Sequence, residues 1–258
     1  MPLKALIFDV DGTLSDTERD GHRPAFNLAF AEAGMDWHWD VALYGELLAV
    51  TGGKERIKFY VERYRPDYRP PADFPALVAR LHAAKTRHYA ALLARGGIPL
   101  RPGVERLLRE ARSRGMRLAI ATTTTPANVT ALLQHALSAD AAGWFEVIAA
   151  GDVVPAKKPA PDIFNYALTQ MGLAPTDCLA FEDSENGLRA ARAAGIETVI
   201  TVNDYTREHD FTGAVLVLDH LGEAGQPFTR LAGGASTTHG VFDLALALQL
   251  HSHSGRRI

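Results

Sequence analysis

Short apolar runs alternate with helical patterns from about residue 100 onward, and this alternation constrains the fold of the 258-residue chain more than any other feature. The apolar runs have the length and residue types of buried strands and cover 118–121, 147–150, 178–181 and 196–202. Helical spacing of apolar residues fills 104–111, 126–133, 161–171 and 188–194. Strands that alternate with helices indicate βαβ crossovers. The sequence therefore predicts an α/β fold with a Rossmann-like, mostly parallel sheet covered by helices on both faces.

Residues 16–95 interrupt this alternation with a block that has helical patterns and little strand signal. Apolar residues show helical spacing in 25–30, 57–64 and 77–93, and a proline-rich stretch at 66–71 separates the last two segments. We therefore expect a core formed by 1–15 and 96–230, with an inserted α-helical cap domain formed by 16–95. Residues 231–258 should form a C-terminal segment that is helical over 241–250.

The composition excludes several classes of protein. The net charge is −3 and the pI about 6.4, so the chain lacks the basic field of a nucleic-acid-binding protein. No apolar run approaches the roughly 18 residues needed to cross a bilayer, so we expect no membrane association. A strand pattern begins directly after Met1–Lys4, which predicts that there is no signal peptide. Because Cys178 is the only cysteine, no internal disulfide can form, and a reducing cytoplasm is the expected location. We also expect the protein to be a monomer.

Two carboxylates directly follow the first apolar run, Ala5–Phe8. Asp9 and Asp11 are two residues apart, and side chains at that spacing on a strand point the same way. Like charges so close together repel each other, and a divalent cation that prefers oxygen ligands, such as Mg²⁺, would relieve that repulsion. The alternative is an ordinary polar turn, since Asp and Gly12 are common turn residues.

Three further polar clusters stand at or near predicted strand ends. Thr122 and Thr123 follow one run and could bind a phosphate at the mouth of the next helix, although threonines there also cap helices without a ligand. Lys158 could neutralise a phosphoryl oxygen or be a solvated surface lysine. Glu182 and Asp183 could complete a metal site or merely compensate a helix dipole. Taken together, the four clusters predict a metal-assisted phosphoryl-transfer site.

These motifs resemble those of the haloacid dehalogenase-like phosphatases over roughly residues 4–220. The matching segments are Asp9-Val-Asp11-Gly-Thr13, Thr122, Lys158-Pro-Ala-Pro-Asp162 and Glu182-Asp-Ser-Glu-Asn-Gly187. The helical insertion after the first motif is similar to that of the subgroup that includes β-phosphoglucomutase. Within this subgroup the chain resembles the CbbY proteins, which are phosphatases of xylulose 1,5-bisphosphate that serve the Calvin cycle. Residues 51–56 and 202–206 carry that finer resemblance.

The resemblance implies a role for each core motif. Asp9 would attack phosphorus and become an aspartyl phosphate. Asp11 would protonate the leaving alkoxide and later take a proton from the hydrolytic water. Mg²⁺ would be bound by Asp9, the backbone carbonyl of Asp11 and Asp183, with Glu182 as a further ligand. Thr122 and Lys158 would hold the transferring phosphoryl group, with Thr123 beside them.

The cap is expected to select the substrate. Gly52 and Gly53 before Lys54 would let backbone N–H groups approach a phosphate, and this basic loop at a helix start could serve as a second anion site. For Lys85, Arg87 and His88 the alternative is a solvated helix face, which we favour for at least one of them. The candidate substrate-binding residues of the cap are Glu18, His22, Thr51, Gly52, Gly53, Lys54, Arg56, Lys85 and His88.

These observations predict a Mg²⁺-dependent phosphatase of a small phosphorylated sugar, with xylulose 1,5-bisphosphate hydrolysed to xylulose 5-phosphate as the leading expectation. One alternative is a mutase of the β-phosphoglucomutase type, which would return the phosphoryl group to the sugar. A second alternative is a non-enzymatic binding protein on the same fold. The presence of both Asp9 and Asp11 argues against that second alternative.

Overall fold

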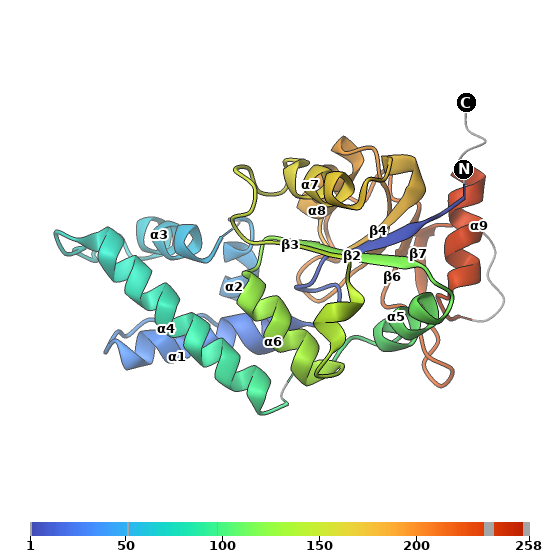
Figure 1. Ribbon diagram of the computed structural model, residues 1–258. Coiled ribbons are helices and arrows are strands. Elements are labelled where there is room, and N and C mark those ends of the chain that lie inside the picture. Colours follow the sequence, from blue (N-terminus) through green and yellow to red (C-terminus); the bar gives the residue numbers. More distant parts are fainter. Residues whose placement is uncertain (1, 51, 97, 235–239, 255–258) are drawn as a thin grey trace. The chain divides into compact units, whose positions relative to one another are not determined.

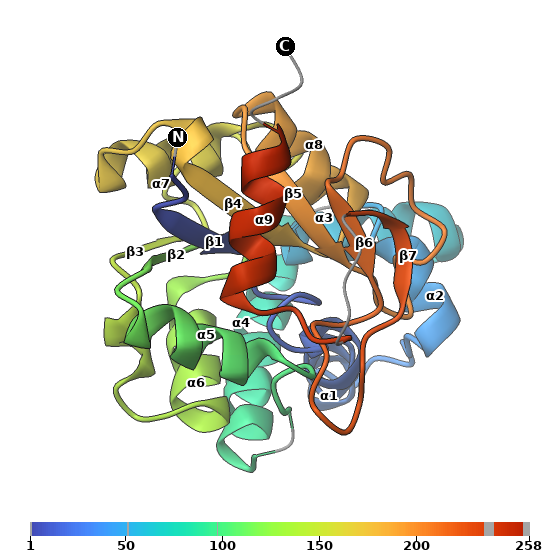
Figure 2. The same ribbon diagram turned by 90° about the vertical axis from the view of Figure 1, so that its right-hand side faces the viewer.

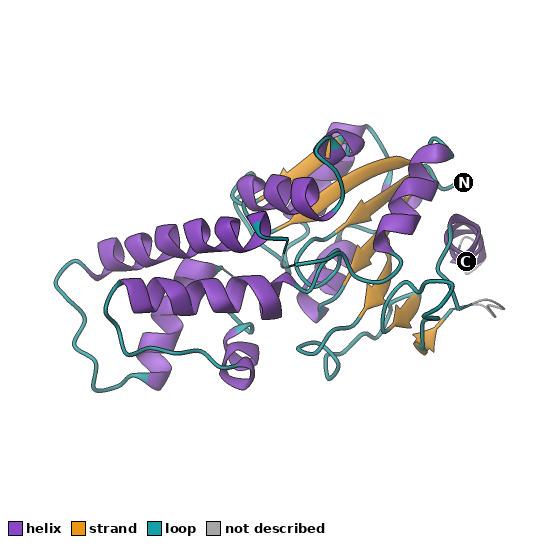
Figure 3. Cartoon of the chain, turned by 90° about the horizontal axis from the view of Figure 1, so that it is seen from below, coloured by secondary structure: helices purple, strands orange, loops and turns teal. Residues whose placement is uncertain are grey.

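The computed structural model describes residues 2–50, 52–96, 98–234 and 240–254. The chain divides into two compact units, one formed by Met1–Asp16 with Pro99–Ile258 and the other by Thr17–Ile98. We call them the core unit and the cap unit. Within the described residues, every strand belongs to the core unit, and the cap unit is built from helices and loops (Figure 3).

The core unit contains one seven-stranded sheet in the order β3-β2-β1-β4-β5-β6-β7. Strands β1 to β6 run parallel, and only β7 is antiparallel to its neighbour. The first strand is therefore central, with β2 and β3 on one side of it and β4, β5 and β6 on the other. In open α/β sheets, ligands bind at the carboxyl ends of the strands where the order reverses in this way. The strands are β1 (Ala5–Phe8), β2 (Arg117–Thr122), β3 (Val147–Ala150), β4 (Cys178–Glu182), β5 (Glu197–Thr201), β6 (Leu216–Leu218) and β7 (Arg230–Gly233).

Helices cover both faces of the sheet, as the alternating pattern predicts (Figure 1). Alternate strand residues such as Ala5 and Ile7 pack against α7 (Asp162–Met171) and α8 (Glu185–Ala193). The opposite face carries α5 (Val104–Ser113) and α6 (Pro126–Ala136) (Figure 1). On the sheet itself, the rings of Phe8 and Phe181 stack with centroids 4.5 Å apart. This two-sided burial explains why the strands read as continuous apolar runs.

The C-terminal part of the chain belongs to the core unit. The predicted core ends at residue 230, whereas β7 begins there and extends the sheet beside β6. The expected terminal helix is present as α9 (Leu244–Ser254), next to α5 (Figure 2). Neither β6 nor β7 was predicted, because β6 is only three residues long and all four residues of β7 are exposed.

The cap unit consists of α1 (Arg23–Glu32), α2 (Val41–Leu47), α3 (Gly53–Tyr64) and α4 (Phe74–Ala94), preceded by a π-helical turn, η1 (Glu18–His22). Its interior is aromatic: Trp39 packs against Phe26, Phe30 and Tyr60 at centroid distances of 4.7, 4.8 and 5.4 Å. Helix α2 is absent from the predicted elements, because its seven residues are too few to show a periodic pattern. Among the described residues, no helix has both the length and the apolar character needed to cross a membrane.

Candidate active site

The register of the central strands brings the predicted polar clusters together. Phe8, the last residue of β1, pairs with Ile120 on β2 and Phe181 on β4. The backbone N–H of the next residue, Asp9, donates to the Phe181 carbonyl at 2.9 Å. Because parallel strands end at the same edge of a sheet, the residues that follow β1, β2 and β4 become neighbours there.

Lys158 lies at the centre of this group. Its ammonium donates to Asp9 Oδ1 at 2.7 Å, to the Ala121 carbonyl at 2.8 Å and to Glu182 Oε1 at 2.5 Å. These bonds use all three ammonium donors of a side chain that is 6% exposed. The alternative that Lys158 is a solvated surface lysine is therefore wrong.

Three carboxylates are buried around this lysine. Asp9, Glu182 and Asp183 each offer an oxygen, and these oxygens lie within 4.8 Å of one another. Burial raises the pKa of all three groups. Repulsion from Asp9 adds to the rise in the pKa of Glu182 and Asp183, and repulsion from Asp11 adds to that of Asp9. Burial alone would lower the pKa of Lys158, but Asp9 and Glu182 raise it instead. One ammonium among three carboxylates leaves an excess of negative charge, which a cation would compensate.

The donor set of this cluster fits Mg²⁺. Carboxylate oxygens are the ligands that this ion prefers, and the site has an acidic side chain from two separate strand ends. Asp9 and Asp183 are the carboxylates that the resemblance implies as metal ligands, and Lys158 donates to Asp9 as well as to Glu182. Glu182 is adjacent to them and remains a further candidate ligand.

The threonines divide between two roles. Thr122 is buried at the end of β2, and its hydroxyl donates to the Asp9 carboxylate. Thr125 instead caps α6, accepting from the backbone N–H of Asn128 at 3.3 Å. Thr123 is partly buried between them. Helix capping thus explains one threonine of the run, and Thr122 belongs to the carboxylate cluster.

The loop that carries Asp11 is held in a tight conformation by Gly12. This glycine has φ +86°, and a Cβ built there would come within 2.3 Å of Asp183 Oδ2 and 2.5 Å of Asn203 Nδ2. Asp11 itself is partly buried directly before it. Only a glycine therefore lets this loop pass so close to the acidic cluster.

Asn203 lies in the segment 202–206 that carries the finer resemblance, and no role was predicted for it. Its Nδ2 donates to Asp183 Oδ2 at 2.7 Å, and its own backbone N–H donates to Thr206 Oγ1 at 3.0 Å. The signal that could have identified it is the same as for the other clusters, because Asn203 comes two residues after β5. This amide orients one of the candidate metal ligands.

The cap unit contains a separate polar cluster, formed by the two candidate residues Glu18 and Arg56 together with Tyr44. The Tyr44 hydroxyl donates to Glu18 Oε2 at 2.5 Å and accepts from Arg56 Nη1 at 2.7 Å. Arg56 Nη1 also lies 3.7 Å from Glu18 Oε2, and both Arg56 and Tyr44 are buried. Tyr44 comes from the unpredicted helix α2, so no sequence signal marked it.

His22 and Lys85 form a second pair in the cap unit. His22 Nδ1 and Lys85 Nζ are 2.8 Å apart, and both side chains are buried. The ammonium lies over the rings of Phe26 and Tyr89 at 5.1 and 5.3 Å. Lys85 is therefore not on a solvated helix face.

The remaining cap candidates have different surroundings. Helix α3 begins at Gly53 after Gly52, which has φ +102°, and Lys54 is exposed at its second position. Thr51 lies outside the described residues. His88 bonds to Glu32 at 2.7 Å, and Arg87 contacts the same carboxylate. This partly exposed arrangement matches the solvated-face alternative for Arg87 and His88.

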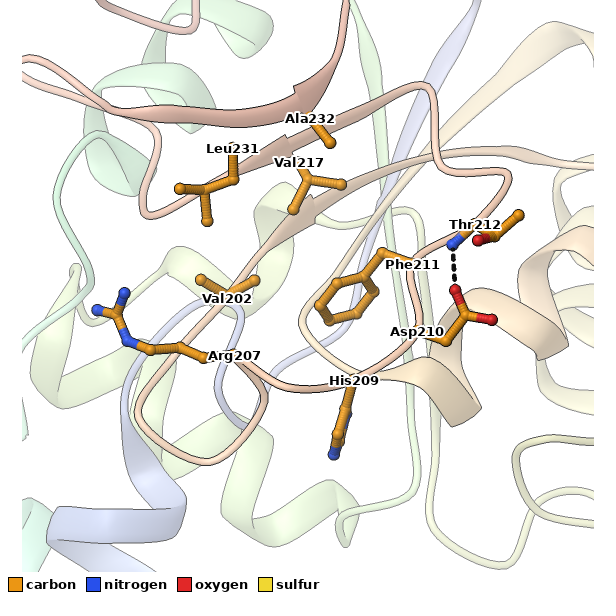
Figure 4. Close-up of a pocket in the computed structure, with 9 residues that line it drawn as sticks. All are labelled: Val202, Arg207, His209, Asp210, Phe211, Thr212, Val217, Leu231 and Ala232. Carbon is orange, nitrogen blue, oxygen red and sulfur yellow. Dashed lines mark hydrogen bonds between the residues drawn. The ribbon is translucent and has the colours of Figure 1, made fainter.

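A shallow groove of about 340 Å³ lies in another part of the core unit, beside β6 and β7 (Figure 4). Its lining includes Val217 and Leu231 from these strands, and Phe211 from the preceding loop. None of the buried carboxylates lines it. The acidic cluster at the strand ends is therefore the candidate active site.

Comparisons with known proteins identify the family of the chain. A model of haloacid dehalogenase-like hydrolases matches residues 3–195. The chain is 51% identical over 249 residues to protein CbbY (plasmid) of Cupriavidus necator, covering 96% of this chain and 97% of that protein. The crystal structure of CbbY from Rhodobacter sphaeroides in complex with phosphate has 46% sequence identity and a TM-score of 0.78, covering 86% of this chain and 96% of that one. A mutant of that protein in complex with xylulose-(1,5)bisphosphate gives the same values.

The extent of these matches decides the family. The hydrolase model covers well over half of the chain, and the CbbY relative aligns along nearly its whole length. The resemblance inferred from the motifs is confirmed, and the alternative of a non-enzymatic binding protein is not supported. The chain belongs to the haloacid dehalogenase-like hydrolases and, within them, to the CbbY-like phosphatases.

Proposed function

We propose that this phosphatase hydrolyses a small sugar phosphate with Mg²⁺ bound at the acidic cluster, and that its substrate is xylulose 1,5-bisphosphate. The observation that carries the reaction is the buried contact of Asp9 with Lys158, beside Glu182 and Asp183. The substrate is supported by the 46% identical CbbY protein whose mutant was crystallised with xylulose-(1,5)bisphosphate.

In this proposal Asp9 is the nucleophile. Its carboxylate attacks phosphorus, the bond from phosphorus to the sugar oxygen breaks, and an aspartyl phosphate forms. Asp11 donates a proton to the departing alkoxide. Water then attacks the aspartyl phosphate, Asp11 takes up the proton of that water, and inorganic phosphate leaves.

The surrounding groups would reduce the electrostatic repulsion between the Asp9 carboxylate and the phosphoryl group, both of which are anionic. Lys158 contacts Asp9 directly, so its ammonium lies where it can also neutralise a phosphoryl oxygen. The Thr122 hydroxyl would donate to the same phosphoryl group. Asp9, Asp183 and the Asp11 carbonyl would hold Mg²⁺, which supplies positive charge to the phosphoryl oxygens when bound.

The cap unit would recognise the part of the sugar that is not transferred. Lys54 and the backbone N–H groups at the start of α3 suit a second phosphate. Glu18 could accept hydrogen bonds from sugar hydroxyls, and Tyr44 and Arg56 hold its carboxylate in place. A bisphosphate therefore suits the cap better than a monophosphate.

The test is phosphate release by the wild-type protein and by Asp9→Asn, with and without Mg²⁺. We expect the wild type to release inorganic phosphate and xylulose 5-phosphate only with the metal, and Asp9→Asn to be folded but inactive. Asp177→Asn is the matched control, because it changes a buried carboxylate at the opposite end of β4. Full activity of Asp9→Asn would disprove the nucleophile, and a rearranged sugar phosphate as the main product would establish the mutase alternative.

A further inference from the structure

Arg101 occupies the junction where the chain returns to the core unit. Asp16 is the last residue of the core unit before the cap, and Pro99 is the first residue after it. Ser15 and Leu100 form an antiparallel bridge, and the Arg101 backbone N–H donates to the Leu14 carbonyl at 2.8 Å. The two linking segments therefore run side by side within the core unit.

The Arg101 side chain is buried and donates to backbone carbonyls from three separate segments of the chain. Its side chain is 7% exposed, and its Nε lies 3.3 Å from Asp16 Oδ1. The carbonyls come from the loop after β1, the end of β5 and the residue after β6. They belong to Gly12, Thr201 (2.9 Å), Val202 (2.5 Å) and Asp219 (2.7 Å).

This arrangement requires an arginine. A guanidinium has five donors in a rigid fork and stays charged, whereas a lysine has three donors at a single point. Without the guanidinium, the carbonyls around it would lose a buried hydrogen-bond donor, which is costly in a dry environment.

The contact with Gly12 links this cluster to the catalytic loop. The Gly12 N–H donates to the Ser15 carbonyl at 2.8 Å, and its carbonyl accepts from Arg101 Nη1. Because peptide groups are planar, these two bonds orient the peptide planes on both sides of Gly12, and the first of them belongs to Asp11. The two planes meet at the Gly12 Cα, so a shift of the Gly12 carbonyl that changes φ there would also turn the peptide group of Asp11.

We propose that Arg101 is a positioning residue for Asp11, which it acts on through Gly12. The guanidinium holds the catalytic loop to the ends of β5 and β6 and to the linking segments, and so keeps the Asp11 carboxyl aligned for proton transfer. This inference rests on the proposed role of Asp11 as the acid that protonates the leaving group.

Two substrates separate this role from a merely structural one. A sugar alkoxide needs a proton when it leaves, whereas p-nitrophenolate leaves without one. For Arg101→Ala we expect kcat/KM for xylulose 1,5-bisphosphate to fall about 100-fold, the usual effect of misplacing a catalytic group by about 1 Å. The kcat/KM for p-nitrophenyl phosphate should change far less. Guanidinium chloride should restore part of the lost activity, and sodium chloride at the same concentration should not.

Arg106 provides the matched control. It lies on α5 and donates to the carbonyls of Gly222 and Phe242 at 3.0 and 2.9 Å, and both of these partners lie outside the loop of Asp11. Arg106→Ala should lower the melting temperature and leave the ratio of the two kcat/KM values unchanged.

An Arg101→Ala protein that loses activity equally on both substrates, or on neither, overturns the inference. If this variant does not fold, Arg101→Lys replaces it with the same expected selectivity, and an unchanged ratio overturns the inference. A wild type that releases no phosphate from the sugar phosphate refutes the proposed function itself, whereas failure of the Arg101 inference leaves wild-type turnover intact.

Discussion

Gly187 lies so close to Glu182 that a Cβ atom built on it would come within 1.9 Å of Glu182 Oε2. Gly187 is in the first turn of α8, and its N–H donates to the Ser184 cap at 3.1 Å. The helix can therefore approach the buried carboxylate only because position 187 has no side chain. Glu182 in turn binds Lys158, so this close approach supports the geometry of the acidic cluster.

We predict that Gly187→Ala impairs catalysis more than folding. The added methyl group must push the Glu182 carboxylate away from Lys158, and displacements of about 1 Å in an active site cost about 100-fold in rate. Steady-state kinetics with a sugar phosphate measure the effect. Gly143→Ala is the control, because a Cβ there meets no atom within 4 Å. Equal activity of the two variants would contradict the prediction.

Asn203→Ala should weaken the apparent affinity for Mg²⁺. Removal of the amide frees Asp183 to rotate, and loss of such a supporting hydrogen bond typically costs about 10- to 100-fold in metal affinity. Activity measured over a range of Mg²⁺ concentrations gives the affinity, and kcat at saturating metal should recover most of its wild-type value. An unchanged metal dependence would show that Asn203 does not orient the ligand.

Lys54→Ala should weaken recognition of a second phosphate. Loss of one charge-assisted hydrogen bond corresponds to about a tenfold fall in kcat/KM for xylulose 1,5-bisphosphate. Activity on p-nitrophenyl phosphate should be unaffected, because that substrate has no second phosphate. Lys58→Ala provides the control, since Lys58 is also exposed and lies one turn further along α3. A similar loss in both variants would point to a general charge effect instead.

The stability of the protein should fall in acid partly because of His82. Burial, followed by repulsion from Lys85 and Lys54, lowers the pKa of this imidazole from 6.5 to about 4. Between these two values the unfolded chain binds a proton that the folded protein does not. The free energy of unfolding therefore falls as the pH drops from 6.5 toward 4.

The size of this effect can be bounded. A single group changes the free energy of unfolding by at most about 1.4 kcal/mol for each pH unit, and solvent screening around the partly exposed ring makes the change smaller. Denaturant unfolding of the wild type and of His82→Gln across this range measures the difference. The wild type should lose more stability than the variant on acidification, and parallel curves would exclude the titration of His82.

The sequence by itself determined the α/β class and the edge of the sheet that carries the chemistry. The strands β1, β2, β4 and β5 are buried along nearly their whole length, so they appear as apolar runs, and polar residues stand out where these runs end. Asp9, Thr122 and Glu182 could be identified in this way. Their neighbourhood also follows from the sequence, because parallel strands must end at a common edge.

Tertiary structure alone decided how these side chains are paired. Sequence spacing cannot show that Lys158 bonds to Glu182 as well as to Asp9, that Asn203 supports Asp183, or that Arg101 binds the Gly12 carbonyl. Each of these contacts joins residues far apart in the chain, and many other pairings are compatible with the same local pattern. The strand β7 was equally hidden, because an exposed edge strand has no apolar face that the sequence must record. Local periodicity indicates which residues are buried. The partners of a buried polar group are determined by the packing of the whole core unit.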